Sequence, residues 1–252
     1  MRSVIVCEGS TDFALIQYFM RTAYLWQDCS EDKILQHNSK FNIARTLEKN
    51  NNYLTIAGVG GCQNIISRVS FLLKRNCKSP DSKDAFQKMV IVIDRDEIDT
   101  EEKFTKQLQD CFDSYDIERQ ADIKHNEWQK CHYVNSRKEK IEMLFLVLII
   151  PFEETGALET FLLNAVSKKD SYDAQIISEC NTFVERIDPQ KKYLHQRRYI
   201  TKAKFDVYFS IRTPLGQFVE RQDILKNVPW EDYAEIQTSF KKLKELEVNE
   251  ES

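Results

Sequence analysis

The chain has 252 residues, of which 42% are hydrophobic and 30% charged, and its formal net charge at pH 7 is −4. This composition excludes a largely disordered chain, and the negative charge excludes a histone-like protein that coats nucleic acid through bulk charge. No apolar run approaches the roughly 20 residues that a membrane-spanning helix needs. The first residues also lack the apolar stretch of a signal peptide. We therefore expect a cytoplasmic protein with no membrane association.

Short apolar runs alternate with amphipathic segments along the first 150 residues. Strands are predicted where apolar and β-branched residues run together, at residues 4–7, 53–57, 89–93 and 143–150. Helices are predicted where apolar residues recur at three- and four-residue intervals, at residues 13–26, 41–49, 64–75 and 100–115. The polar residues 116–140 show no clear period and are interpreted as an insertion.

The last hundred residues are predicted to be mostly helical, around a strand at 205–211 and before a charged C-terminal helix. Alternating strands and helices are typical of an α/β fold with a mainly parallel, Rossmann-like central sheet flanked by helices. We divide the chain into a core at residues 1–166 and a mostly helical extension at 167–252. The extension is expected to pack on the core and to supply basic residues.

Acidic residues follow two of the predicted strands. Glu8 follows the first strand and Asp12 lies one helical turn later, while Asp94 and Asp96 follow the third and project to the same side of an extended chain. Ligands of open α/β sheets bind beyond the carboxyl ends of the strands. Acids there also make turns or complement helix dipoles. Placed together after two buried strands, these four predict a site for divalent metal ions, which prefer oxygen ligands.

These segments also resemble the motifs of a known family. Residues 4–12, V-I-V-C-E-G-S-T-D, resemble the Glu-Gly motif of Toprim domains, and residues 92–96, V-I-D-R-D, resemble their Asp-x-Asp motif. The family includes topoisomerases, primases, recombination mediators, small ribonucleases and the OLD (overcoming lysogenization defect) nucleases. An acid four residues after the motif glutamate is most similar to the OLD-type and small stand-alone Toprim nucleases. The ATPase motif of full-length OLD proteins, Gly-x-x-x-x-Gly-Lys-Ser/Thr, does not occur in the sequence.

The resemblance implies roles for residues later in the chain. Residues 151–159 resemble the Gly-x-Leu-Glu element whose acid supports a second metal ion, which carries that role to Glu159, with Glu153 and Glu154 as nearby substitutes. Residues 199–205 resemble the region that supplies a lysine to the same site, and Lys202 and Lys204 are equal candidates. A lysine ammonium there could stabilise the charge that develops on a phosphate.

The implied metal site is a two-metal site for Mg²⁺ or Mn²⁺. One ion would be held by Glu8, Asp94 and Asp96, and the second by Asp12 and Glu159. Two ions about 4 Å apart can assist the hydrolysis of a phosphodiester.

A basic stretch lies between residues 186 and 204, with Asp188 as its single acid and with tyrosines and a histidine interleaved. Such a stretch can follow a nucleic-acid backbone and stack on unpaired bases, or it can be a solvated face. The expected nucleic-acid-binding residues are Arg186, Lys191, Lys192, Arg197 and Arg198.

The sequence thus predicts a Toprim-type, metal-dependent endonuclease that hydrolyses DNA or RNA. The resemblance further implies an effector of bacterial anti-phage defence and a separate ATPase partner protein. The sequence is also compatible with a homo-oligomer. Two alternatives stay open. One is a primase-like nucleotidyl transferase, and the other is a non-enzymatic Toprim-like subunit that binds nucleic acid or assists assembly.

Overall fold

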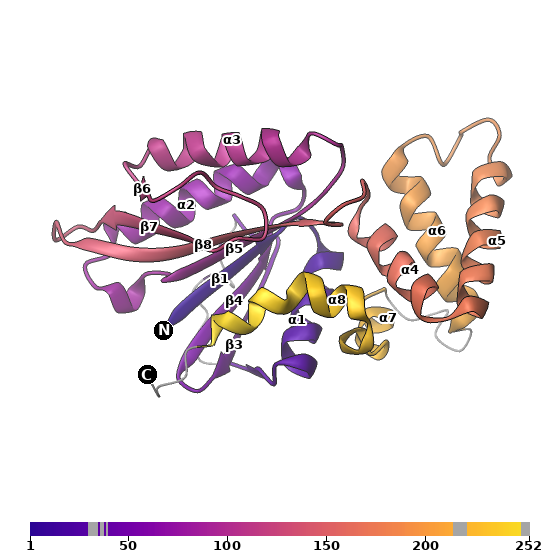
Figure 1. Cartoon of the computed structure of the whole chain (residues 1–252), viewed down its shortest axis with the longest axis horizontal. Coiled ribbons are helices and arrows are strands. Elements are labelled where there is room, and N and C mark those ends of the chain that lie inside the picture. The colour runs from indigo at the N-terminus through magenta and orange to yellow at the C-terminus, as the bar shows by residue number, and fades with distance from the viewer. Residues whose placement is uncertain (30–34, 36–37, 39, 214–220, 248–252) are drawn as a thin grey trace.

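The apolar segments of the sequence form the centre of one mixed sheet. In the computed structural model, which describes residues 1–29, 35, 38, 40–213 and 221–247, the strand order is β2-β3-β4-β1-β5-β8-β7-β6 (Figure 1). The strands are Arg2–Cys7 (β1), Gln27–Asp28 (β2), Ile43–Lys49 (β3), Asn52–Gly58 (β4), Lys88–Asp94 (β5), Glu118–Arg119 (β6), Gln129–Val134 (β7) and Lys140–Ile150 (β8).

The sheet is parallel at its centre and antiparallel at both edges. Strand β1 pairs in parallel with β4 and β5, and β5 pairs in parallel with β8. The pairs β2–β3, β3–β4, β6–β7 and β7–β8 are antiparallel. The α/β class and the parallel central strands were expected, but the edges make the sheet mixed rather than mainly parallel.

Two hydrophobic cores bury the two faces of the central strands. Alternation along β1 directs Val4 and Val6 into one core and Ile5 and Cys7 into the other. Because both faces are covered, the central strands have the nearly continuous apolar sequences that allowed their prediction.

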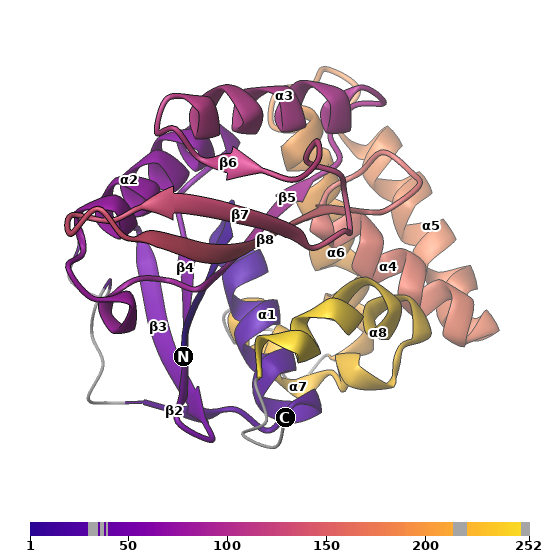
Figure 2. The same ribbon diagram turned by 60° about the vertical axis from the view of Figure 1, so that its left-hand side comes forward.

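Helices form three groups around the sheet. Helices α2 and α3 cover one face, α1 and α8 lie on the other, and α4, α5 and α6 stand together beyond one end of the sheet (Figure 1). Helix α7 packs beside α1 (Figure 2). The helices are Ser10–Ala23 (α1), Ile65–Lys78 (α2), Thr100–Asp113 (α3), Leu158–Lys169 (α4), Ser171–Ile187 (α5), Arg197–Arg212 (α6), Arg221–Asn227 (α7) and Ala234–Phe240 (α8), with short 3-10 turns at Cys62–Asn64, Ser82–Asp84, Trp230–Asp232 and Lys241–Leu246.

Three local predictions were wrong or incomplete. Residues 41–49 contain strand β3 rather than a helix, because Asn50 and Asn51 close a tight hairpin to β4 with φ of 48° and 57°. Residues 205–211 belong to helix α6 rather than a strand, and its buried residues Phe205, Tyr208 and Phe209 have helical spacing. The interpreted insertion contains the edge strands β6 and β7.

The C-terminal part is mostly helical and packs on the core, with α8 contacting α4 and α7 contacting α1. Helix α4 runs through residues 166 and 167, where we expected the extension to begin. Across the described ranges, no helix combines the length and apolarity that crossing a membrane requires.

Candidate active site

A cleft lies where the chain leaves the central strands in opposite directions. After β1 the chain enters α1 on one face of the sheet, whereas after the neighbouring strands β4 and β5 it enters α2 and α3 on the other (Figure 1). This divergence opens a crevice at the carboxyl end of β1. The crevice is a cleft with a volume of ≈ 900 Å³.

The cleft collects the acids that the sequence singled out. Segments that follow four adjacent strands reach it, and α6 closes its far side. Five of its six carboxylates are the acids that the sequence predicted: Glu8 after β1, Asp12 in α1, Asp94 and Asp96 at and after the end of β5, and Glu159 in the first turn of α4, and the sixth is Glu97. Glu8 and Glu159, which are 151 positions apart in the chain, therefore line the same cleft.

Backbone amides hold two of these carboxylates across neighbouring strands. The Asp94 N–H donates to Glu8 Oε1 at 2.9 Å, which joins the ends of β1 and β5. The Leu158 N–H at the start of α4 donates to Asp94 Oδ1, also at 2.9 Å. A chain of hydrogen bonds thus fixes the ends of β1, β5 and α4 against each other.

The second pair of acids lies on helix ends. Asp12 Oδ2 accepts a hydrogen bond from the Gly9 N–H at 3.0 Å, and the Asp12 residue is 6% exposed. Glu159 is 5% exposed, and its Oε1 accepts from Thr11 Oγ1 at 3.4 Å. Both acids lie in the first turn of a helix, where the macrodipole favours negative charge.

Burial and repulsion between charges raise the pKa of three of these carboxylates, those of Glu8, Asp12 and Asp94. Burial, reinforced by the charges of Asp12 and Asp96, raises the pKa of Glu8 to about 8, although its hydrogen bond from the Asp94 N–H opposes the rise. Burial and then the charge of Glu159 raise the pKa of Asp12 to about 7, and Lys202 lowers it. The pKa of Asp94 rises well above its ordinary value through burial and then through Asp12. A cation among them would relieve this repulsion.

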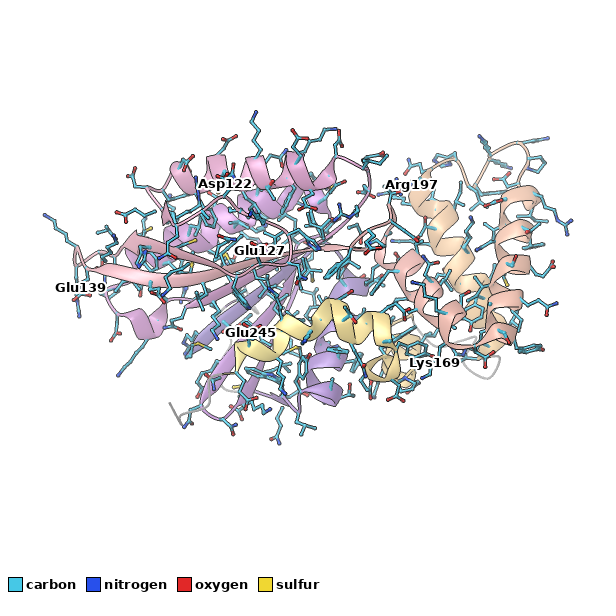
Figure 3. All side chains as sticks on the ribbon, in the orientation of Figure 1. Asp122, Glu127, Glu139, Lys169, Arg197 and Glu245 are labelled. Carbon is cyan, nitrogen blue, oxygen red and sulfur yellow. The ribbon has the colours of Figure 1, made fainter. Side chains whose placement is uncertain are left out.

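Three of the expected basic residues line the cleft. Lys202, Arg197 and Arg198 all project from the first turns of α6. Figure 3 shows Arg197 at the end of α6 nearest the sheet, where its guanidinium donates to the Asp96 carbonyl and lies 3.5 Å from Glu97 Oε1. The extension therefore contributes cations to a cleft whose acids come from the core.

The structure separates Lys204 from Lys202. We expected both lysines on one side of an extended chain, but in helix α6 two residues two positions apart face nearly opposite directions. Lys204 Nζ instead pairs with Glu185 Oε1 on α5 at 2.6 Å.

The other expected nucleic-acid-binding residues do not line the cleft. Arg186 lies in the last turn of α5, and Lys191 and Lys192 lie in the loop before α6. Asp188 accepts the backbone N–H of Lys192 at 3.1 Å and orders that loop.

Sequence reasoning missed the role of Arg95. The residue is buried at 7% exposure, and its Nε donates to the Pro151 carbonyl at 2.9 Å. A second guanidinium nitrogen lies 3.1 Å from Glu101 Oε2 on α3. The Gly156 N–H also donates to the Arg95 carbonyl at 2.8 Å. Arg95 therefore holds the loop that leads to Glu159, and its place between two motif aspartates was the available signal.

Glycines after β4 support the cleft rather than offering amides to a ligand. The N–H groups of Gly60 and Gly61 donate to the Glu8 carbonyl at 2.9 and 2.8 Å, and both glycines have positive φ. Only the glycine backbone adopts this geometry readily. The turn thus holds β4 beside the end of β1.

The donor set suits a hard divalent cation, although its carboxylates are not gathered around one point. Among the residues described, no three His, Cys, Asp or Glu side chains already stand close enough to hold a metal ion. Backbone amides each engage one oxygen of Glu8, Asp12 and Asp94. A carboxylate has a second oxygen for another ligand.

Comparison with known proteins gives a family. A family model described as “Protein of unknown function (DUF3226)” matches residues 2–246. None of the curated proteins matches the chain. Among solved structures, the chain is similar to the hypothetical protein PH0156 from Pyrococcus horikoshii OT3, with 17% identity, a TM-score of 0.43, and coverage of 89% of this chain and 96% of that one.

Proposed function

We propose a function from the geometry of the cleft. The chain belongs to the family described as “Protein of unknown function (DUF3226)”, and this description names no activity. The proposed function is that of a metal-dependent endonuclease that hydrolyses phosphodiester bonds in DNA or RNA. The observation that carries it is that the five predicted carboxylates and Lys202 line one cleft. The parallel strands β1 and β5, each followed by motif acids, further support a Toprim-like core.

The acids would hold the metal ions, as the motif resemblance implies. Glu8, Asp94 and Asp96 would hold one ion, and Asp12 with Glu159 would hold the second. When bound, Mg²⁺ or Mn²⁺ supplies charge stabilisation at the phosphate and lowers the pKa of a water molecule.

The other residues of the cleft bind and position the strand. Lys202 lines the cleft together with the acids and lowers the pKa of Asp12, and its ammonium can donate to a phosphate oxygen as negative charge develops. Arg197 and Arg198, on the rim, can bind flanking phosphates.

A cleavage assay tests this function. Single-stranded DNA, duplex DNA and structured RNA are incubated with the protein in Mg²⁺, Mn²⁺ or chelator. We expect metal-dependent cleavage that Glu8→Gln and Asp94→Asn each reduce by more than about 100-fold, beyond the usual loss on removing groups that only orient metal ligands. Lys226→Gln, an exposed change on α7, serves as the control. Undiminished cleavage by both acid variants would refute the site assignment.

The same assay format separates the alternatives. Extension of a labelled primer with nucleoside triphosphates, without cleavage, would favour a primase-like transferase. Calorimetry that detects no Mg²⁺ or Mn²⁺ binding dependent on Asp94 and Asp96 would favour a non-enzymatic binding or assembly subunit. The role in anti-phage defence and the ATPase partner stay predictions from resemblance.

A further inference from the structure

A second concavity of ≈ 520 Å³ lies beside the last turns of α2. It is lined by four cations, Lys40, Lys74, Arg75 and Lys78, against a single carboxylate, Asp84. No described carboxylate lies within ion-pair distance of the four cations, and the buried Nε of Arg75 has no hydrogen-bond partner in the described part of the chain. We call this concavity the α2 pocket.

The α2 pocket joins an aromatic ring to its cations. Phe71 is half-buried in its wall, and Lys40 Nζ lies 4.3 Å from the centre of that ring. Basic residues in the last turn of a helix also offset its macrodipole. That role requires neither Lys40, which comes from another segment, nor an aromatic wall. Cations around an aromatic surface are instead the combination that binds single strands, phosphates on the cations and a base or sugar on the ring.

Two segments of the chain connect the α2 pocket with the catalytic cleft, although no residue lines both. Lys40 lines the pocket, whereas Asn42 and Ile43 line the cleft. Two residues of chain span at most about 7 Å, so this segment passes from the edge of one space to the edge of the other. Helix α2 also joins them, because Gln63 just before it lines the cleft and its C-terminal turns line the pocket.

We propose that the α2 pocket binds a single-stranded segment of nucleic acid that continues out of the catalytic cleft. Lys74, Arg75 and Lys78 bind its phosphates, and Phe71 contacts a base or sugar. The path of the strand rests on the proposed nuclease function, but binding in the pocket does not, so the two are tested separately.

Fluorescence anisotropy with labelled single-stranded oligonucleotides tests the α2 pocket. A strand of twelve nucleotides is long enough to leave the cleft, and one of four serves as the short probe. Measurements in Ca²⁺, whose coordination geometry differs from that of Mg²⁺, report binding apart from cleavage. We expect Arg75→Gln with Lys78→Gln to weaken binding of the longer strand about tenfold and to lower its salt slope by about 0.7 for each phosphate that is no longer bound. Binding of the four-nucleotide strand should be unchanged.

Matched variants separate the roles of the ring and the cations. Phe71→Leu keeps an apolar side chain against Phe41 but removes the stacking surface, and we expect it to weaken binding of the longer strand about tenfold. Lys226→Gln removes one cation on the opposite face of the sheet and should leave affinity unchanged. Circular dichroism melting checks that each variant folds.

The outcomes are distinct. If the α2 variants bind the longer strand like wild type while wild type cleaves nucleic acid, the pocket proposal fails and the nuclease proposal stands. If they lose affinity but wild type shows no cleavage under any metal, the pocket proposal stands and the nuclease proposal fails. A mononucleotide that binds as tightly as the longer strand would assign the pocket to a free nucleotide and overturn the proposal.

Discussion

At the scale of single residues, Lys202 and Lys204 show how secondary structure selects between equal candidates. Both lie in the same motif-like segment, residues 199–205, and an extended chain would present both to the cleft. Helix α6 presents Lys202 to the acids and Lys204 to Glu185. The two lysines therefore form a natural matched pair of one cleft cation and one surface cation.

We predict that Lys202→Ala lowers cleavage by about 10²- to 10³-fold, the usual cost of removing one donor from a developing negative charge. Lys204→Ala removes a partly exposed ion pair, which contributes little to stability, and should leave both stability and cleavage nearly unchanged. Single-turnover rates with saturating substrate measure both variants. Equal losses in the two would show that neither lysine acts through the cleft.

At the scale of elements, local sequence predicted those segments whose pattern matches their environment. The buried strands β1, β4, β5 and β8 and the helices α1, α2 and α3 all lie where apolar runs or helical spacing indicated. Strand β3 was predicted as a helix because the prediction did not take account of the Asn50-Asn51 turn, which pairs this segment with β4. Helix α6 was misread because its aromatic residues suit a strand as well as a helix.

The Asn50-Asn51 hairpin gives a direct test of that explanation. Asn51 has a φ of 57° and is exposed, so a β-branched side chain there meets steric strain without losing buried contacts. We predict that Asn51→Val lowers the free energy of unfolding by about 1–2 kcal/mol. Asn51→Gly, which accepts this φ, should be neutral or stabilising. Urea denaturation measures both, and equal stability of the two variants would contradict the turn assignment.

At the scale of the whole molecule, some residues of the site could be predicted from the sequence and others could not. The acids at positions 8, 12, 94 and 96 were predictable because they follow buried strands within short motifs. Thr11, Arg95 and the wall formed by Asn42 and Gln63 were not, because their roles depend on which distant segments meet. Tertiary contacts, not local pattern, decide those roles.

The cleft also makes the stability of the metal-free molecule depend on pH. The pKa of Glu8 is raised to about 8 and that of Asp12 to about 7, from ordinary values of 4.5 and 3.8. The folded state thus prefers their protonated forms. The stability they contribute is complete below about pH 4 and is lost as the pH rises through about 7 to 8.

We compare wild type with the double variant Glu8→Gln/Asp12→Asn in the presence of chelator. As the pH rises from 5 to 9, we predict that the free energy of unfolding of wild type falls relative to that of the double variant. Urea denaturation at several pH values measures the difference, and the neutral double variant cancels contributions from other groups. Mg²⁺ should restore wild type most at high pH, where the carboxylates are ionised. A stability difference that does not vary with pH would contradict the raised pKa values.

The position of α6 in the chain has a consequence for biosynthesis. The ribosome makes the protein from its N-terminus, so the acids of β1, α1, β5 and α4 emerge before Lys202 and the arginines of α6 exist. A partly made chain, or one truncated before α6, carries the whole acidic set without the cations that face it. Completion of the cleft therefore requires translation through α6.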